Sequence, residues 1–427
     1  MELGAQVAGE AADTAESGTR PDDATGDGQR RGAVAADHGG HGDPPGFTAR
    51  AGRVVRSILP ALAVYAAVRV VGLIVLALLA RHQRVSLWTY LMRADGGWLL
   101  GIVRRGYDPL GPIVEPGRPP MSNIAFFPLY PGLVKVVGAL PGVNLTAAAL
   151  FVTAVSGLAA AAGLARFGER LAGGRTAGLV LVVLWAAWPH SVVLVMAYSE
   201  ALFVALVVWS LVCLLEERWL WAGVLSLLAG ATRAFGLALA AAIAVAALLV
   251  LVRALREHRP RDAARPVLAA LIAPLGQFGY WGWLWLHTGR PDAWFYVQRT
   301  QWRSTFDGGV NTLQVMSQTA MRPTQLVVVV CMLLILASIV LLVALAVDGA
   351  PLPVLVYSAI VVLIVFGDAN YQYSKARFLL AAFPLLLVPV RALAGMRLRT
   401  VPVLLGGVVL LSAWYNAYVL LLWPRSP

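Results

Sequence analysis

The chain has 427 residues, of which 59% are hydrophobic and 13% are charged, and its formal net charge is +12. A soluble domain carries about 25% charged residues, so the composition excludes that class and favours a polytopic membrane protein. Nucleic-acid binding is not indicated, because no basic stripe lies on a soluble segment. Lysine occurs only at Lys135 and Lys375, and this arginine-rich composition is typical of a GC-rich bacterial genome. Cys213 and Cys331 lie inside apolar stretches and indicate no disulfide framework.

Residues 1–49 are rich in Gly, Ala, Asp and His and contain few large apolar side chains. Such a segment cannot bury enough surface to offset its ordering entropy, which predicts a disordered cytoplasmic tail before a membrane domain over residues 50–427. His38 and His41 in this tail are better explained by low-complexity composition than by metal binding. Neither an Asp-x-Asp nor a His-x-x-x-His motif occurs in the sequence, so we expect no metal and no other cofactor.

Apolar segments recur along the rest of the chain, and about 20 apolar residues cross a bilayer as a helix. We therefore expect an all-α polytopic protein with about eleven transmembrane helices. The predicted spans are residues 58–81, 144–165, 176–188, 200–215, 219–232, 234–252, 266–287, 325–347, 352–366, 376–391 and 401–423. The apolar segment 127–140 is too short, and Pro128, Pro131 and Pro141 bound it, so we expect it to lie along the membrane surface.

Arginine is distributed unequally over the predicted loops. When the N-terminus is placed inside, the inside loops contain the arginine clusters of residues 50–56, 166–175, 253–265 and 391–399. The positive-inside rule therefore predicts a cytoplasmic N-terminus. A twelfth span over 127–140 would turn the 253–265 cluster outward, so the same rule favours eleven spans.

The outward face then gathers most of the uncommon polar residues. It comprises the long first loop 82–143, the corner before Glu200, and the loops 288–324 and 367–375. Carboxylates, arginines and aromatic residues above an apolar bundle suit a substrate whose lipid tail lies in the bilayer and whose polar headgroup lies at the surface.

Asp95 is the candidate general base for a glycosyl transfer, in which a base takes the proton of the acceptor hydroxyl. It lies early in the loop 82–143 beside glycines that let backbone and substrate approach closely. The alternative is that Asp95 caps a helix beginning near Gly96. Trp98 and Tyr107 can offer aromatic faces to a sugar ring.

A phosphate leaving group needs cations, and the outward face supplies Arg233, Arg303, Lys375 and Arg377. Arg233 lies between apolar stretches, so its partner is either a phosphate or an internal carboxylate such as Glu200. Glu200 begins a helix, where a carboxylate also favours the helix dipole. For Lys375 and Arg377 the alternative is snorkelling to the membrane interface.

Several of these residues belong to short motifs that follow a recognisable order. The motifs are Asp95-Gly96-Gly97-Trp98, Gly106-Tyr107, Phe126-Phe127-Pro128-Leu129-Tyr130-Pro131, Tyr198-Ser199-Glu200-Ala201-Leu202-Phe203, Thr232-Arg233-Ala234-Phe235-Gly236, and Arg377-Phe378-Leu379-Leu380 with Phe383-Pro384. Over residues 93–384 they resemble the motifs of PIG-V-type mannosyltransferases and, more broadly, of the GT-C glycosyltransferases. One departure is Ala94, which stands where that family has Trp.

The resemblance implies a GT-C-like bundle, a polyprenyl-phosphate-mannose donor, transfer with inversion, and a catalytic carboxylate in the first outer loop, here Asp95. We therefore expect a mannosyltransferase of the cytoplasmic membrane, with its active site on the extracytoplasmic face and a glycolipid or surface glycan as acceptor. The alternatives are a GT-C transferase for another sugar, a lipid-linked-sugar flippase or transporter, and a non-catalytic scaffold that could dispense with Asp95. Transporters often contain internal repeats, and none is evident in this sequence.

Overall fold

The computed structural model describes residues 47–110, 121–397 and 399–426. The prediction of a disordered tail over residues 1–49 falls outside these residues except for 47–49, which belong to the first helix. The described residues form helices and loops without a strand, and one isolated bridge pairs Phe306 with Asp368. The all-α fold class is therefore confirmed, and residues Ala51–Pro427 form one compact unit.

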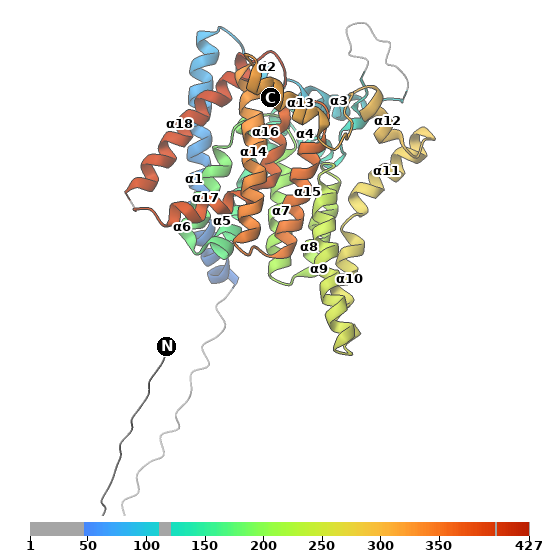
Figure 1. Ribbon diagram of the computed structural model, residues 1–427. Coiled ribbons are helices and arrows are strands. Elements are labelled where there is room, and N and C mark those ends of the chain that lie inside the picture. The colour runs from blue at the N-terminus through green and yellow to red at the C-terminus, as the bar shows by residue number, and fades with distance from the viewer. Residues whose placement is uncertain (1–46, 111–120, 398, 427) are drawn as a thin grey trace, which may run out of the picture. The chain divides into compact units, whose positions relative to one another are not determined.

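The helices follow one another in chain order (Figure 1). The α-helices are α1 (Phe47–His82), α2 (Leu87–Leu91), α3 (Asp95–Arg105), α4 (Leu129–Gly138), α5 (Leu145–Ala172), α6 (Arg175–Ala186), α7 (Glu200–Leu215), α8 (Trp219–Gly230), α9 (Gly236–Arg256), α10 (Ala264–Ile272), α11 (Leu275–Thr288), α12 (Ala293–Thr300), α13 (Val310–Met321), α14 (Leu326–Val347), α15 (Leu352–Gly367), α16 (Lys375–Phe378), α17 (Leu387–Ala394) and α18 (Thr400–Leu421). The 3-10 helices are η1 (Asn123–Ala125), η2 (Ser191–Val195), η3 (Pro260–Ala263), η4 (Gln372–Ser374) and η5 (Leu379–Leu386).

Seven helical segments of the described chain are long and apolar enough to cross a membrane. They are Ile58–His82, Leu145–Ala172, Gly236–Arg256, Pro260–Thr288, Leu326–Val347, Gln372–Ala394 and Thr400–Leu421, and each coincides with a predicted span. The other four predicted spans are α6, α7, α8 and α15, with 12 to 16 residues. The longest of these reaches about 24 Å, which is short of a hydrocarbon core of about 30 Å. A multi-pass membrane protein is therefore confirmed, and the total of eleven crossings stays a prediction.

The segment 127–140 contains α4, a helix of 10 residues. At about 1.5 Å per residue it spans about half of a bilayer core, so it is too short to cross. The hydroxyl of Tyr130 donates to the carbonyl of Ala149 in α5 at 3.0 Å, which fastens α4 to the first residues of that long helix. The short length agrees with the expectation that this segment does not span the membrane.

Close packing of α5, α6 and α7 builds the centre of the bundle. The side chains of Phe167, Trp185 and Phe203 are almost completely buried there. Gly178 of α6 lies directly on the backbone of α5, because a Cβ atom at this position would overlap the carbonyl of Ala165. Helices in a membrane gain little from burying apolar surface against one another, so small residues that permit close backbone approach hold them together.

Loops that were predicted to share one side of the membrane meet at one end of the bundle. Glu216, after α7, pairs with Arg170 of α5 at 2.6 Å, and Arg391 of α17 pairs with Asp348, after α14, at 2.9 Å. Arg391 also donates to the carbonyl of Leu171, which connects the two ion pairs. In Figure 1 the turn between α5 and α6 lies at the lower end, whereas α2, α3 and α13 lie at the upper end. The contacts therefore support the predicted alternation of loops, and the side that faces the cytoplasm stays a prediction.

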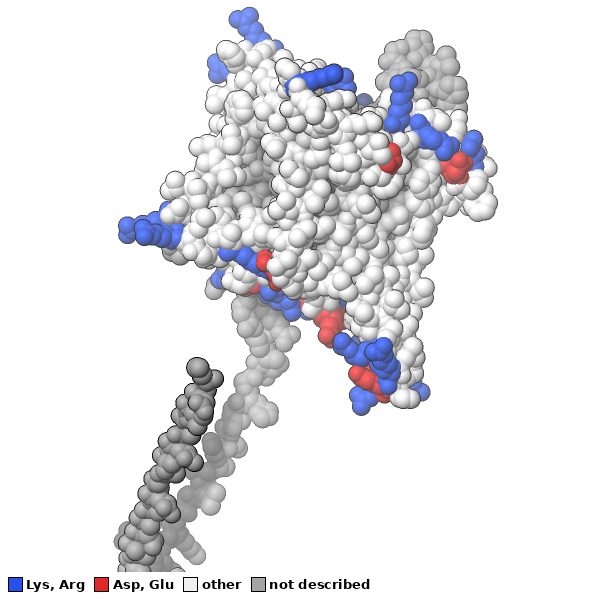
Figure 2. Space-filling view, viewed as in Figure 1, with Lys and Arg blue, Asp and Glu red and all other residues white. Residues whose placement is uncertain are grey.

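The charged side chains follow the same division. Figure 2 shows Lys and Arg along the upper rim and along the sloping lower rim, with a broad zone between them that is nearly free of charge. Large apolar side chains of the long helices are exposed, among them Leu78 of α1, Leu333 of α14 and Leu411 of α18. An apolar belt between two charged rims is the surface expected of a protein that sits in a bilayer.

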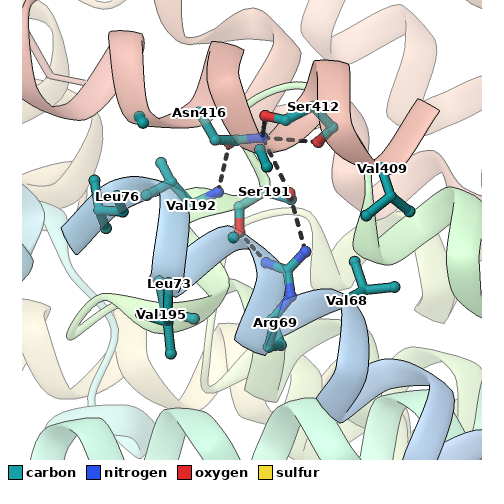
Figure 3. Close-up of a pocket in the computed structure, with 13 residues that line it drawn as sticks. Val68, Arg69, Leu73, Leu76, Ser191, Val192, Val195, Val409, Ser412 and Asn416 are labelled. Atoms are coloured by element: carbon teal, nitrogen blue, oxygen red, sulfur yellow. Dashed lines mark hydrogen bonds between the residues drawn. The ribbon is translucent and has the colours of Figure 1, made fainter. Parts of the chain in front are cut away.

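One arginine lies inside an apolar span and stabilises a helix break. Arg69 of α1 faces the segment between α6 and α7, where Pro189 precedes the 3-10 helix η2. Its guanidinium donates to the carbonyl of Ser191 at 2.8 Å, and the side chain of Asn416 in α18 accepts from the backbone N–H of Val192 at 2.7 Å (Figure 3). Backbone groups freed by a helix break at membrane depth need partners within the protein, and these two side chains provide them.

Candidate functional site

A cavity of about 780 Å³ lies where the predicted outer loops come together. It is bounded by the start of α3, the Phe126–Phe127 segment, the turn between α8 and α9, α12, the segment 302–306, and the segment 368–378. Ligand pockets usually measure about 300–1,000 Å³. Loops that are far apart in the sequence therefore form one cavity that is large enough for a polar headgroup.

Asp95 lines this cavity as the first residue of α3. Its carboxylate Oδ2 accepts a hydrogen bond from Nη1 of Arg377 at 2.8 Å, and its backbone N–H donates to the hydroxyl of Tyr198 at 3.3 Å. Ala94 occupies the position before the helix and has φ +55°, a conformation that favours glycine. The side chain of Asp95 thus binds an arginine 282 positions away, rather than serving as the helix cap considered from the sequence.

Two arginines and two carboxylates form one network beside the cavity. Arg377 Nε lies 3.4 Å from Oε1 of Glu200, and the same oxygen lies 2.8 Å from Nη1 of Arg233. Arg233 also donates to the hydroxyl of Ser199 at 3.1 Å. The side chain of Glu200 is 4% exposed, and burial of a charge requires such partners. The network therefore runs from Asp95 through Arg377 and Glu200 to Arg233, with equal numbers of positive and negative charges.

Three members of this network line the cavity and Glu200 does not. Asp95 and Arg233 line the cavity, as does Arg377, whereas Glu200 lies behind them at the start of α7. From the sequence, Glu200 was considered either a partner of Arg233 or a residue that favours the dipole of its helix. It has both roles, because it is the first residue of α7 and its side chain contacts Arg233.

Aromatic rings cover the cavity next to Asp95. Trp98 stacks on Phe126 with ring centroids 6.5 Å apart, and the ring of Trp302 stands edge-on to both at 5.3 Å. All three residues line the cavity. Trp98, one of the aromatic residues singled out from the sequence, therefore lines the cavity, and Trp302 is a further aromatic lining residue that no sequence motif singled out.

A second polar wall of the cavity comes from loops that were placed on the outward face but were not assigned to the site from the sequence. It contains Ser304, Asp368 and Tyr371, with Gln298 and Arg299 of α12 beside them. Burial raises the pKa of the Asp368 carboxyl above its usual range, and it raises the pKa of Tyr371 to about 12. Asp368 directly follows an apolar helix on the predicted outward face, and that placement is the signal that could have identified it.

Two further candidates from the sequence lie away from the cavity. The hydroxyl of Tyr107 donates to the carbonyl of Phe126 at 3.0 Å, and its ring packs against Tyr280 and Trp283 behind the aromatic residues. Arg303 is exposed and is not among the residues that line the cavity in the described part of the chain. Tyr107 supports the aromatic wall, and Arg303 stays at the surface.

Lys375 has a position different from that expected of a phosphate ligand. Its side chain is fully buried. Its Nζ donates to the carbonyls of Val365 at 2.6 Å and Asp368 at 2.7 Å and to the hydroxyl of Thr312 at 2.8 Å. Lys375 therefore satisfies the free carbonyls at the end of α15 and joins that end to α13. Its neighbour in the motif, Arg377, is the residue that reaches the cavity.

The arrangement offers the carboxylates of Asp95 and Asp368, the guanidinium groups of three arginines and several aromatic faces within one cavity. In the described residues, no three or more His, Cys, Asp or Glu side chains are grouped so that they could hold a metal ion. No protein-family model matches the chain, and no curated protein matches it.

Proposed function

We propose that this protein is an integral-membrane glycosyltransferase that transfers mannose, with inversion, from a polyprenyl-phosphate donor to a hydroxyl group of a glycolipid or surface glycan. The observation that carries the proposal is the network joining Asp95 to Arg233, whose two ends line one cavity. The donor sugar, mannose, is taken from the motif resemblance. The class of reaction is argued from the residues themselves.

Inverting transfer places the acceptor oxygen and the leaving phosphate on opposite faces of the anomeric carbon. The acceptor oxygen forms its bond to that carbon while its proton passes to the base, and the bond to the phosphate oxygen breaks as the phosphate leaves with the electron pair. A base and a phosphate-binding cation must therefore be near each other but not adjacent. Asp95 and Arg233 meet this requirement, because Arg377 and Glu200 lie between them.

This geometry assigns different tasks to the two arginines. Arg377 Nη1 holds Oδ2 of Asp95, so it orients the base. Arg233 is paired with Glu200 through Nη1, and the rest of its guanidinium is available to the phosphate as charge develops on the leaving group. A phosphate monoester product carries less charge than a diphosphate, so side-chain cations are sufficient for this leaving group.

The lipid chain of the donor requires an apolar approach to the same cavity. Phe127, Phe235 and Phe378 line it together with the arginines, and the ring of Phe378 lies 5.9 Å from the Arg233 guanidinium. An apolar surface beside a phosphate-binding cation matches the junction between a polyprenyl chain and its phosphate.

The proposal is tested by Asp95→Asn, which keeps the shape of the side chain and removes its basicity. Membranes with each variant receive polyprenyl-phosphate [14C]mannose, and label entering membrane glycans is counted. We expect a loss of about 10²-fold to 10⁴-fold, the usual contribution of a general base. Asp348→Asn is the matched control, because Asp348 also pairs with an arginine, at 2.9 Å, at the opposite end of the bundle.

Two results would contradict the proposal. Full transfer by the Asp95→Asn variant would remove Asp95 from the chemistry and favour a scaffold. Movement of the labelled donor across the membrane by the wild-type protein, without transfer to any glycan, would favour a flippase. The melting temperature of each purified variant in detergent separates loss of chemistry from loss of fold.

A further inference from the structure

The cavity has a second polar wall, where Asp368 and Ser304 lie with Gln298 and Arg299 of α12 beside them. The segments 302–307 and 367–371 form most of this wall. They are joined by backbone hydrogen bonds from Asp307 N–H to the Gly367 carbonyl at 2.9 Å and from Ala369 N–H to the Thr305 carbonyl at 2.8 Å. Side chains strengthen the contact, since the Tyr371 hydroxyl donates to the Trp302 carbonyl at 2.9 Å. This wall is therefore a fixed surface and not a pair of independent loops.

Asp368 is the carboxylate that this wall presents to the cavity, and Arg299 of α12 also lines the cavity. The hydroxyl of Ser304 donates to its Oδ1 at 2.8 Å, which fixes the carboxylate. Beside it lie Trp302 and the amide of Gln298, both lining the same cavity. A fixed carboxylate, an amide and an aromatic face are the groups that bind the hydroxyls and the apolar face of a sugar ring.

We infer that the wall of Ser304, Asp368, Gln298 and Trp302 is the acceptor subsite, and that it binds the hydroxyl groups of a sugar or polyol headgroup. This inference rests on the proposed function, because it identifies the second substrate of the same cavity. The Asp368 carboxylate, fixed by Ser304, accepts hydrogen bonds from hydroxyl groups, so it suits a hydroxylated acceptor. The acceptor oxygen must also approach from the face opposite to the phosphate, and Arg233 belongs to a different segment of the lining, the turn between α8 and α9.

The aromatic residues place this subsite within reach of the base. Trp302 of the wall contacts Trp98 at a ring distance of 5.3 Å, and Trp98 lies one helical turn after Asp95 in α3. A sugar ring held against Trp302 would therefore lie next to the aromatic neighbour of Asp95, from which one of its hydroxyls can reach the carboxylate.

Binding is measured without any transfer by the labelling of a cysteine on the wall. Thr305 is exposed and lines the cavity, so Thr305→Cys provides a site for a maleimide. The native Cys331 is buried, and Cys213 is changed to Ser in all samples. The probes are n-octyl α-mannoside and n-octyl β-glucoside, with an octyl detergent that lacks hydroxyl groups as the negative control.

We expect at least one glycoside, and not the control detergent, to slow the labelling of the cysteine introduced by Thr305→Cys. Asp368→Asn in the same background should raise the glycoside concentration needed for half-protection by about 10-fold to 100-fold, as loss of a hydrogen bond to a charged group does. Asp307→Asn is the matched control, because Asp307 is in the same pair of segments but does not line the cavity in the described structure. It should leave protection within about twofold of that of the parent.

Lack of protection by both glycosides, or equal protection with and without the Asp368 carboxylate, would overturn the inference. Transfer assays then separate it from the proposed function. Protection that depends on Asp368 in a protein without transferase activity supports the sugar-binding wall and contradicts the transferase. Transfer by the Asp368→Asn variant with a lower kcat and an unchanged KM for the glycoside would make Asp368 part of the chemistry and would refute its role as an acceptor-binding residue.

Discussion

The ion pair between Asp95 and Arg377 is buried, so its two charges should be strongly coupled in the free energy of unfolding. The two side chains are 16% and 6% exposed. Arg377→Gln leaves both Asp95 and the 4%-exposed Glu200 without this cation, and only Arg233 remains as a partner for Glu200. Removal of one partner from a buried ion pair costs about 3–5 kcal/mol, and we expect a loss of that size for the single variant.

The coupling energy is obtained from the double-mutant cycle of Asp95→Asn and Arg377→Gln. Once Arg377 is absent, Asp95→Asn removes a buried charge that no longer has its partner, so the second substitution should be less harmful than it is alone. We expect a coupling energy of about 1–3 kcal/mol, within the range of residues in direct contact. The measurement is the midpoint of unfolding of the purified variants in one detergent.

The ion pair between Arg391 and Asp348 supplies a matched control cycle. It joins the same two atom types at 2.9 Å, but its side chains are 28% and 38% exposed. Exposed pairs contribute about 0.2–1 kcal/mol, so the cycle of Arg391→Gln and Asp348→Asn should give a smaller value. Additive effects of Asp95→Asn and Arg377→Gln, or equal coupling in the two cycles, would refute the reasoning that burial makes this network strong.

Three further outcomes are expected. Lys375→Met should lower stability by about 2 kcal/mol or more, because the buried carbonyls of Val365 and Asp368 lose their donor; a wild-type melting temperature would contradict this structural role. The backbone N–H groups of Asn311 and Gly309 hold the pKa of Asp307 below its usual value. The ionised Asp307 carboxylate therefore stabilises the folded state above about pH 4, and this contribution is lost as the pH falls through the lower folded-state pKa. Asp307→Asn should therefore flatten the acid side of a stability profile between about pH 6 and about pH 3, and an unchanged profile would exclude this cause. A reporter fused after Arg261 should give the cytoplasmic signal and one after Arg322 the external signal; identical signals would contradict the predicted topology.

The helices could be predicted from the sequence because hydropathy is a local property. Each of the seven membrane-length helices lies where an apolar segment was expected. The four shorter helices are equally apolar, but their ends depend on packing and on helix breaks such as the one at Pro189. Arg69 illustrates the limit, since its neighbours in α1 do not reveal that it hydrogen-bonds the broken segment at Ser191.

The site was only partly predictable. Asp95, Trp98, Arg233 and Arg377 were identified from short motifs, and all four line the cavity. The loop of Asp368 was placed on the outward face, but neither Asp368 nor Trp302 was assigned to the site, because a single carboxylate after a helix and a single tryptophan in a loop do not form a motif. Lys375 was expected at the site. It lies two positions before Arg377 in a helix, so its side chain is on another face, where it donates to backbone carbonyls.

Local composition was enough to determine that this chain is a helical membrane protein, where its long helices lie, and which loops carry arginine, because each of these depends on neighbours in sequence. The partners of the polar groups were decided only by the tertiary structure. Asp95 and Arg377 are 282 positions apart, and Ser304 and Asp368 are 64 apart. A buried charge takes whichever partner the packing of the bundle brings within a few ångströms, and no sequence interval specifies that partner.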